Sequence, residues 1–505
     1  MALRVFNTLT RKLETFEPVA PGKVEIYGCG VTVYDDVHLG HARGALVFEI
    51  IRRYFKFSGY DVTYVRNFTD VDDKIIDRAQ QEGVSVGEIA ERYIRAFDED
   101  MGRLGVPPAD VEPRATEYIP RMVEMIEGLI QKGFAYASGG DVYFSVRSFE
   151  GYGRLSGKNL DDLEAGSRVE VSEHKRDPLD FVLWKAAKPK EPSWDSPWGK
   201  GRPGWHIECS AMSLQLLGEN FDIHGGGEDL IFPHHENERA QSCAFTGGPF
   251  ARYWLHNGLV HIHKEKMSKS TGKFFTLKGV LEKFRPEVVR HFLASSHYRS
   301  PVEYSEEGVA AAGRALDRLY NACLRAEEAC AGKNGNGGPS AAASHEKPGE
   351  ESDEALEGAV KTFESEFTDA MDDDFNTPRA IGAMFTLAHE IHGAVDRAES
   401  PQEATPVDSL QKAVRLLMER AGVLTFLLHK PREWFQQTYA PVEANGEEAP
   451  EALDDSAIKR LIQERREARA RMDWAEADRI RDELKAKNVV LEDGPTGTLW
   501  KRVQV

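Results

Sequence analysis

The feature that most constrains this chain is the stretch from Lys23 to Arg43, which predicts a strand, a tight loop and a helix in succession. The apolar run Val24–Tyr27 predicts a buried strand that ends at the break Gly28-Cys29-Gly30, and the segment from His38 to His41 opens a periodic apolar helix. Unpaired N–H groups and the helix dipole make such a helix start an anion site. A second apolar run, Val62–Val65, completes a unit of the βαβ type.

Two histidines stand at this predicted helix start. His38 and His41 lie three residues apart, so both rings can face one ligand and donate hydrogen bonds to phosphate oxygens. Gly40 between them removes a side chain, which lets a nucleotide approach the backbone. Taken alone, a histidine pair near a helix start is more often a helix cap or a pair of surface side chains than a phosphate site.

Two further segments suit a phosphate ligand. The run Lys266-Met267-Ser268-Lys269-Ser270 places two ammonium groups on one loop, which fits a pyrophosphate leaving group, although a solvated basic loop is the simpler reading. His224 precedes three glycines, and Gly226 among them would let a ligand sit against bare backbone. A simple turn explains these glycines nearly as well.

Four dispersed side chains form a candidate metal set: Cys29, Cys209, His234 and Glu238. Pro233 suits the first position of a helix, from which His234 and Glu238 would project on one face, and each cysteine is expected beside a strand edge. Two thiolates, an imidazole and a carboxylate are an acceptable zinc shell. On spacing alone, two buried free cysteines and an ordinary His–Glu helix pair explain them better. The other three cysteines are predicted to be core residues: Cys243, Cys323 and Cys330.

Composition sets the class of protein. A chain of 505 residues is too long for a single hydrophobic core and should form several domains. No run reaches the roughly 20 apolar residues that are needed to cross a bilayer. The N-terminal residues lack a signal-peptide core, and five scattered cysteines do not form a disulfide framework, so we expect a cytoplasmic protein without membrane contact. The formal charge of −19 argues against loose adhesion to nucleic acid. Residues 456–505 reverse this balance, with 12 Lys/Arg against 9 Asp/Glu.

Together and in this order, these motifs resemble class I aminoacyl-tRNA synthetases and, more narrowly, the cysteinyl-tRNA synthetase family over nearly the whole length. The likeness rests on these segments: Cys29-Gly30 with Thr32 to Asp35, His38–His41, Asn67–Asp70, Gly204–Ser210, Asp222–Glu236 and Lys266–Ser270. Val31 and Leu39 depart from the commoner residues of the family, and neither change removes a polar contact.

The resemblance implies an α/β fold, a class I Rossmann-like parallel-sheet domain split by an insertion, then a helical domain and a small C-terminal α+β unit. The expected parts are 1–132 and 201–275 for the two catalytic halves, 133–200 for the insertion, 276–320 for junction helices, 321–438 for a helical tRNA-binding domain with a flexible segment at 331–353, and 456–505 for an anticodon-binding unit.

The resemblance also implies the reaction and its residues. Cysteine and ATP would form cysteinyl-adenylate, and the cysteinyl group would pass to the 3′ end of tRNA(Cys). One Zn²⁺ per chain, held by the four candidate ligands, would select cysteine over serine through its thiolate; Mg²⁺ would accompany ATP. A purely structural zinc is the competing view. The roles implied are phosphate contacts for His38, Gly40, His41, Gly226, Lys266 and Lys269, and cysteine contacts for Thr32, Trp205 and His224.

The tail would bind the tRNA. Arg465, Arg466, Arg469 and Arg471 are bunched beside Trp474, a pattern that suits an unpaired anticodon base. Asp478 or Asp493 would accept from base amino groups, whereas a charged surface helix with an inward Trp474 is the plainer reading.

The sequence leaves two other functions open: a ligase that joins cysteine to an amino-sugar, and a catalytically silent cysteine- or RNA-binding protein. We expect a monomer.

Overall fold

The computed structural model describes residues 2–159, 174–262, 276–333, 350–398, 407–436, 453–487, 489–494 and 497–502. Its contacts divide the chain into two compact units. Unit 1 comprises 1–277, 296–303 and 371–376, and unit 2 comprises 278–295, 304–370 and 377–505. The six-part division expected from the sequence stays a prediction.

The centre of unit 1 is a parallel four-stranded sheet in the order β10-β9-β3-β4. Its strands are β3 (Lys23–Thr32), β4 (Asp61–Thr69), β9 (Phe221–Gly227) and β10 (Ala251–Asn257). The chain leaves β3 toward β4 and leaves β9 toward β10, so the strand order reverses between β3 and β9. In open parallel sheets the crevice at such a reversal, beyond the carboxyl ends of the strands, is the usual ligand site.

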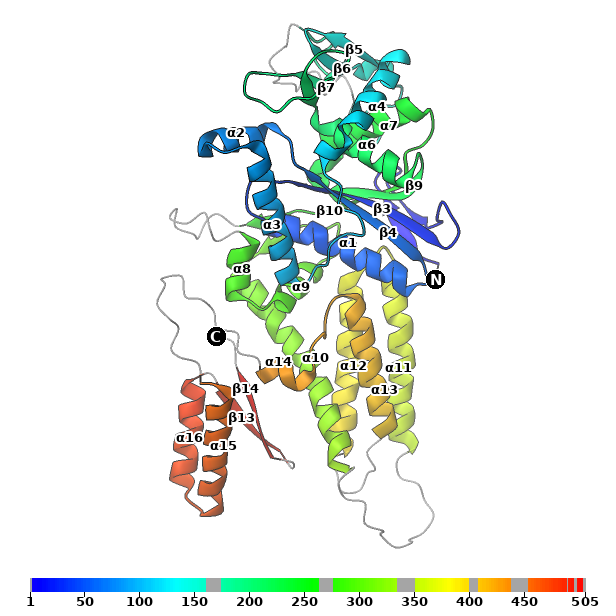
Figure 1. The fold of residues 1–505 in the computed structure, drawn as a ribbon. Helices are drawn as coiled ribbons and strands as arrows, with labels where there is room; N and C mark the ends of the chain where they lie inside the picture. The colour runs from blue at the N-terminus through cyan, green and yellow to red at the C-terminus, as the bar shows by residue number, and fades with distance from the viewer. Residues whose placement is uncertain are drawn as a thin grey trace. The chain divides into compact units, whose positions relative to one another are not determined.

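Helices cover both faces of this sheet (Figure 1). One face carries α1 (Leu39–Phe57), and the other carries α6 (Trp205–Leu217) with α4 (Ile119–Gln131) and α7 (Glu236–Thr246). The large apolar core on the second face includes Tyr27, Cys209 and Phe221. These helices and the parallel sheet confirm the predicted α/β class.

The predicted break at Gly28-Cys29-Gly30 is wrong, because β3 continues through it to Thr32 with a bulge between Gly28 and Val31. The glycines at these positions allow β3 to approach β4 closely. A Cβ on Gly30 would lie 1.6 Å from the Asn67 carbonyl oxygen, and one on Gly28 would lie 3.0 Å from the Tyr64 hydroxyl. The three glycines after His224 lie inside β9, so the alternative reading of these glycines as a simple turn is wrong.

The rest of unit 1 surrounds this core. A separate antiparallel sheet has the order β5-β6-β7-β8. The remaining elements are β1 (Arg4–Asn7), β2 (Lys12–Thr15), α2 (Asp73–Glu82), α3 (Val86–Leu104), η1 (Ala115–Tyr118), β5 (Ala135–Ser138), β6 (Asp141–Phe144), η2 (Val146–Ser148), β7 (Phe181–Ala186), β8 (Gly201–Pro203), η3 (Glu228–Leu230), η4 (Ile231–His235), β11 (Val260–Ile262) and β12 (Val302–Tyr304), the last of which ends in unit 2.

Unit 2 is mainly helical. Its helices are α8 (Leu277–Lys283), α9 (Pro286–Ala294), α10 (Glu306–Lys333), α11 (Glu350–Met371), α12 (Thr377–Ala398), α13 (Val407–Val423) and α14 (Pro431–Gln436), some of which begin or end in unit 1. Cys323 and Cys330 are buried, as predicted, whereas Cys243 of unit 1 is only half-buried. None of the helices within the described ranges has the length and apolar character that a bilayer crossing requires.

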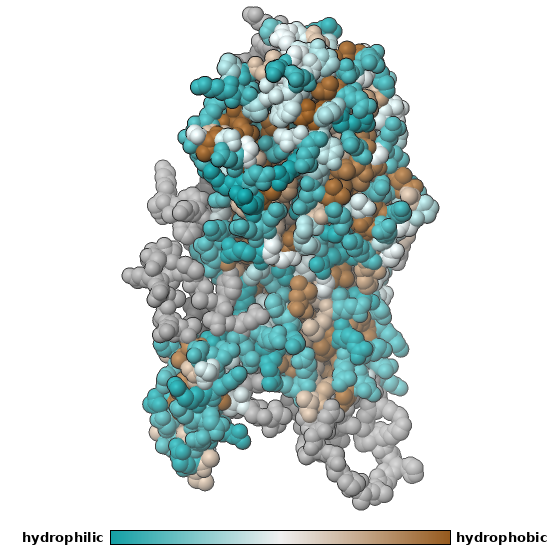
Figure 2. Space-filling view, viewed as in Figure 1, coloured by the Kyte–Doolittle hydropathy of each residue, from teal (hydrophilic) through white to brown (hydrophobic). Residues whose placement is uncertain are grey.

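The chain ends in a small α+β part: α15 (Asp455–Ala470), α16 (Trp474–Ala486), β13 (Val489–Gly494) and β14 (Gly497–Arg502). Ile458, Ile480 and Trp500 are the middle of its own small core. The outer side chains of α15 and α16 are mostly hydrophilic on the face drawn in Figure 2.

Candidate metal centre and nucleotide pocket

A cavity of about 350 Å³ opens at the reversal between β3 and β9. Its wall combines the end of β3, the start of α1, the glycines of β9 and the start of α6. The lining includes Cys29, Gly30, Thr32, His38, Gly40, His41, Gly44, Asn67, Thr69, Trp205, Cys209, Gly226, Asp229, His234, Asn257, Gly258 and Leu259. The cavity thus reaches both the candidate metal ligands and the candidate phosphate contacts.

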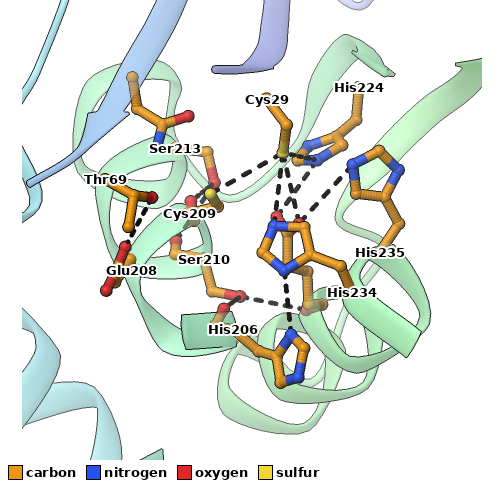
Figure 3. A network of polar contacts seen from close by, with 12 residues as sticks. Cys29, Thr69, His206, Glu208, Cys209, Ser210, Ser213, His224, His234 and His235 are labelled. Atoms are coloured by element: carbon orange, nitrogen blue, oxygen red, sulfur yellow. Dashed lines mark hydrogen bonds and ion pairs between the residues drawn. The ribbon is translucent and has the colours of Figure 1, made fainter. Parts of the chain in front are cut away.

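The four candidate ligands come from three elements and the turn before α7. Figure 3 labels three of them, Cys29, Cys209 and His234. Cys29 projects from β3, and Cys209 projects from the second turn of α6, so the expected strand-edge position of Cys209 is wrong. His234 lies in the turn Ile231–His235, and Glu238 follows in the first turn of α7. The helix therefore does not begin at Pro233, yet the ring and the carboxylate still meet.

The separations of these donor atoms fit a zinc-sized ion. Cys29 Sγ lies 3.8 Å from Cys209 Sγ, 3.6 Å from His234 Nε2 and 3.5 Å from Glu238 Oε1; His234 Nε2 lies 2.9 Å from Glu238 Oε1. With Zn–S of about 2.3 Å and Zn–N or Zn–O of about 2.05 Å, tetrahedral edges are about 3.8 Å for S–S, 3.6 Å for S–N or S–O and 3.3 Å for N–O. Of these four edges, three agree to within about 0.1 Å, and the His–Glu edge is shorter by about 0.4 Å.

A second set of donors overlaps the first. Cys29 and Glu238 also lie near His224 and His235, and these four donor atoms are likewise within 4.8 Å of one another. His224 Nε2 is 3.7 Å from Cys29 Sγ and 3.2 Å from Glu238 Oε2, whereas His235 Nε2 is 3.8 Å from Glu238 Oε1. Neither of these two imidazoles is among the described residues that line the cavity. The first set alone combines two sulfurs with access to the pocket.

The electrostatics of the cluster favour a cation. Burial opposes ionisation, but His224 and His234 hold the pKa of Glu238 well below its ordinary value. The hydrogen bond from Cys29 lowers the pKa of Cys209 to about 6, while burial and Cys209 raise that of Cys29. Despite burial, the Glu238 carboxylate and the Cys209 sulfur raise the pKa of His234 to about 10. The raised pKa values keep protons on His234 and Cys29, next to the ionised Glu238 and Cys209. A metal ion bound by the four groups would displace these protons.

Several buried groups fix these donors, and the sequence reading missed them. His206 Nδ1 lies 2.9 Å from His234 Nδ1, which turns the Nε2 of His234 toward Glu238. His235 is held by His256, with 2.8 Å between their nitrogens. Such supports orient metal-binding imidazoles. The available signal was the run of histidines beside the ligands, but spacing along the chain does not predict their pairing.

A buried acid beside Cys209 was also missed. Glu208 is 1% exposed and accepts a hydrogen bond from Thr69 Oγ1 at 3.0 Å. Burial, followed by the nearby Cys209, raises the pKa of Glu208 well above its ordinary value. This carboxyl ties α6 to the end of β4 beside the cavity.

The two histidines of the α1 start form its cap. His38 Nδ1 accepts from the N–H of Gly40 at 3.1 Å and of His41 at 3.4 Å, while His41 Nδ1 accepts from the N–H of His38 at 3.4 Å. The rings stack at 3.6 Å. Burial lowers the pKa of both, that of His41 to about 3. With each Nδ1 accepting, the proton of each neutral ring sits on Nε2, which can donate to a phosphate.

The other predicted pocket residues fall into two groups. Thr32, Trp205 and Gly226 line the cavity, and the Trp205 ring stacks on His234 with 4.1 Å between centroids. Gly226 avoids a steric clash at this wall, since a Cβ at this position would lie 2.9 Å from the Leu230 side chain. His224 is fully buried behind the cavity wall, so its contact with cysteine stays a prediction.

Two groups of predicted residues lie apart from this geometry. Lys266 and Lys269 fall outside the described residues, as does the side chain of Asp493. In the C-terminal part, Trp474 is 59% exposed, which contradicts the inward reading, and Arg465 is buried, which removes it from the expected cationic face. The exposed members of the predicted set are Arg466, Arg469, Arg471 and Asp478, the last paired with Arg481 at 3.1 Å.

Known families match three stretches of the chain. Residues 15–314 match the family described as the tRNA synthetases class I (C) catalytic domain. Residues 366–428 match the DALR domain, and residues 455–500 match the cysteinyl-tRNA ligase anticodon binding domain.

Curated relatives match over nearly the full length. The chain is 50% identical over 503 residues to a cysteine–tRNA ligase of Thermodesulfovibrio yellowstonii, covering 99% of each chain. It is 51% identical over 505 residues to that of Syntrophobacter fumaroxidans, covering 99% of this chain and 100% of the other. Among solved structures, a Mycobacterium tuberculosis methionyl-tRNA synthetase bound by methionyl-adenylate shares the fold, with a TM-score of 0.60 at 16% identity over 86% of this chain and 96% of the other. The chain therefore belongs to the cysteine–tRNA ligase family of class I aminoacyl-tRNA synthetases.

Proposed function

We propose that this enzyme activates cysteine with ATP to cysteinyl-adenylate and transfers the cysteinyl group to the 3′ end of tRNA(Cys), with the thiol recognised at a zinc site. The carrying observation is that Cys29, Cys209, His234 and Glu238 converge at the wall of the cavity that also holds the start of α1. Substrate sulfur and substrate phosphates would then lie in one crevice.

Cys29, Cys209, His234 and Glu238 would hold the zinc ion. When bound, zinc supplies a soft Lewis acid that prefers a thiolate to a hydroxyl, a distinction that a hydrophobic slot makes poorly. Trp205 stacks on the His234 ring and would close the side of the pocket above it. Thr32 lies on the same wall and would contact the cysteine backbone.

The nucleotide would sit against the start of α1. Activation requires in-line attack of the cysteine carboxylate on the α-phosphate, so the protein mainly positions charge. The neutral rings of His38 and His41 would donate from Nε2 to the phosphates, and Gly40 and Gly226 would admit the backbone approach. We assign Lys266 and Lys269 to the departing pyrophosphate and Mg²⁺ to the ATP.

The C-terminal part would bind the anticodon. Trp474 is exposed at the start of α16, beside the exposed Arg469 at the end of α15. A ring next to guanidinium groups stacks well on an unpaired base. Asp478 and Asp493 remain proposed contacts for base amino groups. The match of residues 455–500 to an anticodon-binding family speaks against the amino-sugar ligase.

The test is cysteine-dependent ATP–pyrophosphate exchange, run beside serine, on protein whose zinc content is measured. We expect exchange with cysteine, at least about 10⁴-fold less with serine on the scale of sites that bond the discriminating group, and about one zinc per chain. Robust exchange with serine, or undiminished cysteine preference in zinc-free protein, would contradict the proposed recognition. Charging of tRNA(Cys) transcript, absent with an anticodon-substituted transcript, tests the second step.

A further inference from the structure

Arg43 is a buried cation for which the proposed chemistry has no use. It lies on α1 two residues after His41, and its side chain is fully buried. All four of its described hydrogen-bond partners are backbone carbonyl oxygens. Nη1 donates to Leu259 at 3.1 Å, and Nη2 donates to His297 at 3.1 Å, Tyr298 at 3.3 Å and Ser300. A guanidinium fork can gather carbonyls from separate segments in this way.

The first of these carbonyls belongs to the pocket. Asn257, Gly258 and Leu259 line the cavity, directly after β10. Leu259 is also followed by β11, which leads into the segment that bears Lys266 and Lys269. Arg43 thus joins the helix that carries the two phosphate-contacting histidines to the opposite wall of the nucleotide pocket.

The other three carbonyls belong to the loop 297–300, which is packed against that wall. Gly258 N–H donates to the Tyr298 carbonyl at 2.8 Å, and a Cβ on Gly258 would lie 2.6 Å from the Ser300 carbonyl group. The Val302 N–H donates to Leu259 at 2.9 Å. These contacts join the loop 297–300 to the Gly258–Leu259 wall.

The loop itself is anchored on its far side. Asp374 accepts from the Tyr298 hydroxyl at 2.9 Å and from Arg299 Nε at 2.7 Å, and it lies in the segment 371–376 that belongs to unit 1. Because Asp374 holds the loop 297–300, the Arg43 guanidinium bonds to carbonyl groups whose positions are already fixed. Arg43 therefore acts on the position of the pocket wall, and its charge is directed at backbone carbonyls and not at the substrate.

We propose that Arg43 is the positioning residue that sets the Gly258–Leu259 wall against the phosphate-binding start of α1. The inference rests on the proposed function. It assigns Arg43 to ATP alignment and gives it no part in cysteine selection, since the wall it holds is separate from the four metal ligands.

The test compares full-length Arg43→Lys and Arg43→Met with Arg290→Lys as a matched control. Arg290 is another buried arginine whose Nε and Nη2 bond a backbone carbonyl, that of Thr425, within unit 2. Exchange kinetics for ATP and for cysteine and the zinc content are measured at a temperature well below unfolding, and the Tm of each variant is measured in a separate thermal scan. The Kd of ATP is measured separately, so the inference is tested even if exchange with cysteine fails.

We expect kcat/KM for ATP to fall about tenfold in Arg43→Lys and about a hundredfold in Arg43→Met, on the scale that misplacement of about 1 Å costs. The Kd of ATP should rise in the same order, while KM for cysteine and zinc content stay within about twofold. Arg290→Lys should leave ATP kinetics within about twofold. Asp374→Asn, which loosens the loop from its far side, should also raise KM for ATP and covers the case in which Arg43→Met does not fold.

Three results would overturn the inference. One is unchanged ATP binding and kinetics in Arg43→Lys. Another is an equal loss in Arg290→Lys, and the third is a parallel loss of zinc and of cysteine affinity, which would make Arg43 a general structural residue.

Discussion

The two overlapping donor sets make different predictions for single substitutions. Cys29 and Glu238 belong to both sets, so their loss cannot tell the sets apart. Cys209 belongs only to the set at the pocket wall, and His235 belongs only to the deeper set. The informative pair of variants is therefore Cys209→Ser and His235→Gln, each close in volume to the native residue.

The size of each effect follows from the geometry. Structural zinc sites bind with about 10–16 kcal/mol, so one of four ligands contributes about 3 kcal/mol, or a factor of about 10² in Kd. A serine oxygen also sits about 0.4 Å short of the sulfur position, because a C–O bond is shorter than a C–S bond. His235 lies 3.8 Å from the Glu238 oxygen that His234 contacts at 2.9 Å, so we assign it a supporting position. Loss of such a support should raise the Kd of zinc by only about tenfold.

The assay is competition for zinc against a chelator of known affinity, with exchange measured for cysteine and serine on the same samples. We expect the Kd of zinc to rise about a hundredfold in Cys209→Ser, so that weaker chelators remove the metal. The preference for cysteine over serine should be lost together with the zinc. His235→Gln should retain both to within about tenfold. The reverse order would refute the assignment, because it would place the ion in the deeper set.

Three further predictions concern the rest of the chain. Trp474→Ala should lower kcat/KM for tRNA charging about tenfold, since stacking is worth about 1–3 kcal/mol per base, with exchange unchanged; an equal fall in exchange would contradict this. Gly30→Ala should lower the Tm by about 5 °C or more because its Cβ meets the Asn67 carbonyl, while Gly87→Ala, with open space, should not. Burial lowers the pKa of His291 to about 4, so its unfolded form gains a proton first as pH falls from 7 to 5. Stability should drop by about 2 kcal/mol over that range, and denaturant unfolding of His291→Leu should show less pH dependence.

Local signals predicted the elements well. The segment after His38 gave the helix that the structure has from Leu39 to Phe57, and the run Val62–Val65 lies within β4. These predictions succeed because apolar periodicity and a helix start are encoded within a few residues. Tertiary demands override them elsewhere. Glycine normally interrupts a strand, but at Gly28 and Gly30 it permits strands and side chains to approach, and this depends on β4.

The metal set shows the same limit. Cys29 and Cys209 are 180 residues apart, and their spacing alone favoured two unrelated core cysteines. The order of motifs made the four ligands a joint hypothesis, whereas His206, which contacts His234, and His256, which contacts His235, carried no separate signal. Which imidazole binds and which supports depends on distances of a few tenths of an ångström, and residue types do not encode these.

The alternation of side chains along β3 would allow the proposed sulfur recognition and the proposed phosphate binding to share one crevice. Successive residues of a strand point to opposite faces of the sheet. Gly28 therefore faces Tyr64 on the side of α1, and Cys29 faces Cys209 of α6 on the other side. The chain then leaves the end of this strand and enters α1 within a few residues, so the candidate metal ligand and the proposed anion-binding helix start belong to one short stretch. A one-residue slip of β3 against β4 would move Cys29 to the α1 face and remove it from the cluster, and for this reason the bulge beyond Gly28 matters as much as the cysteine itself.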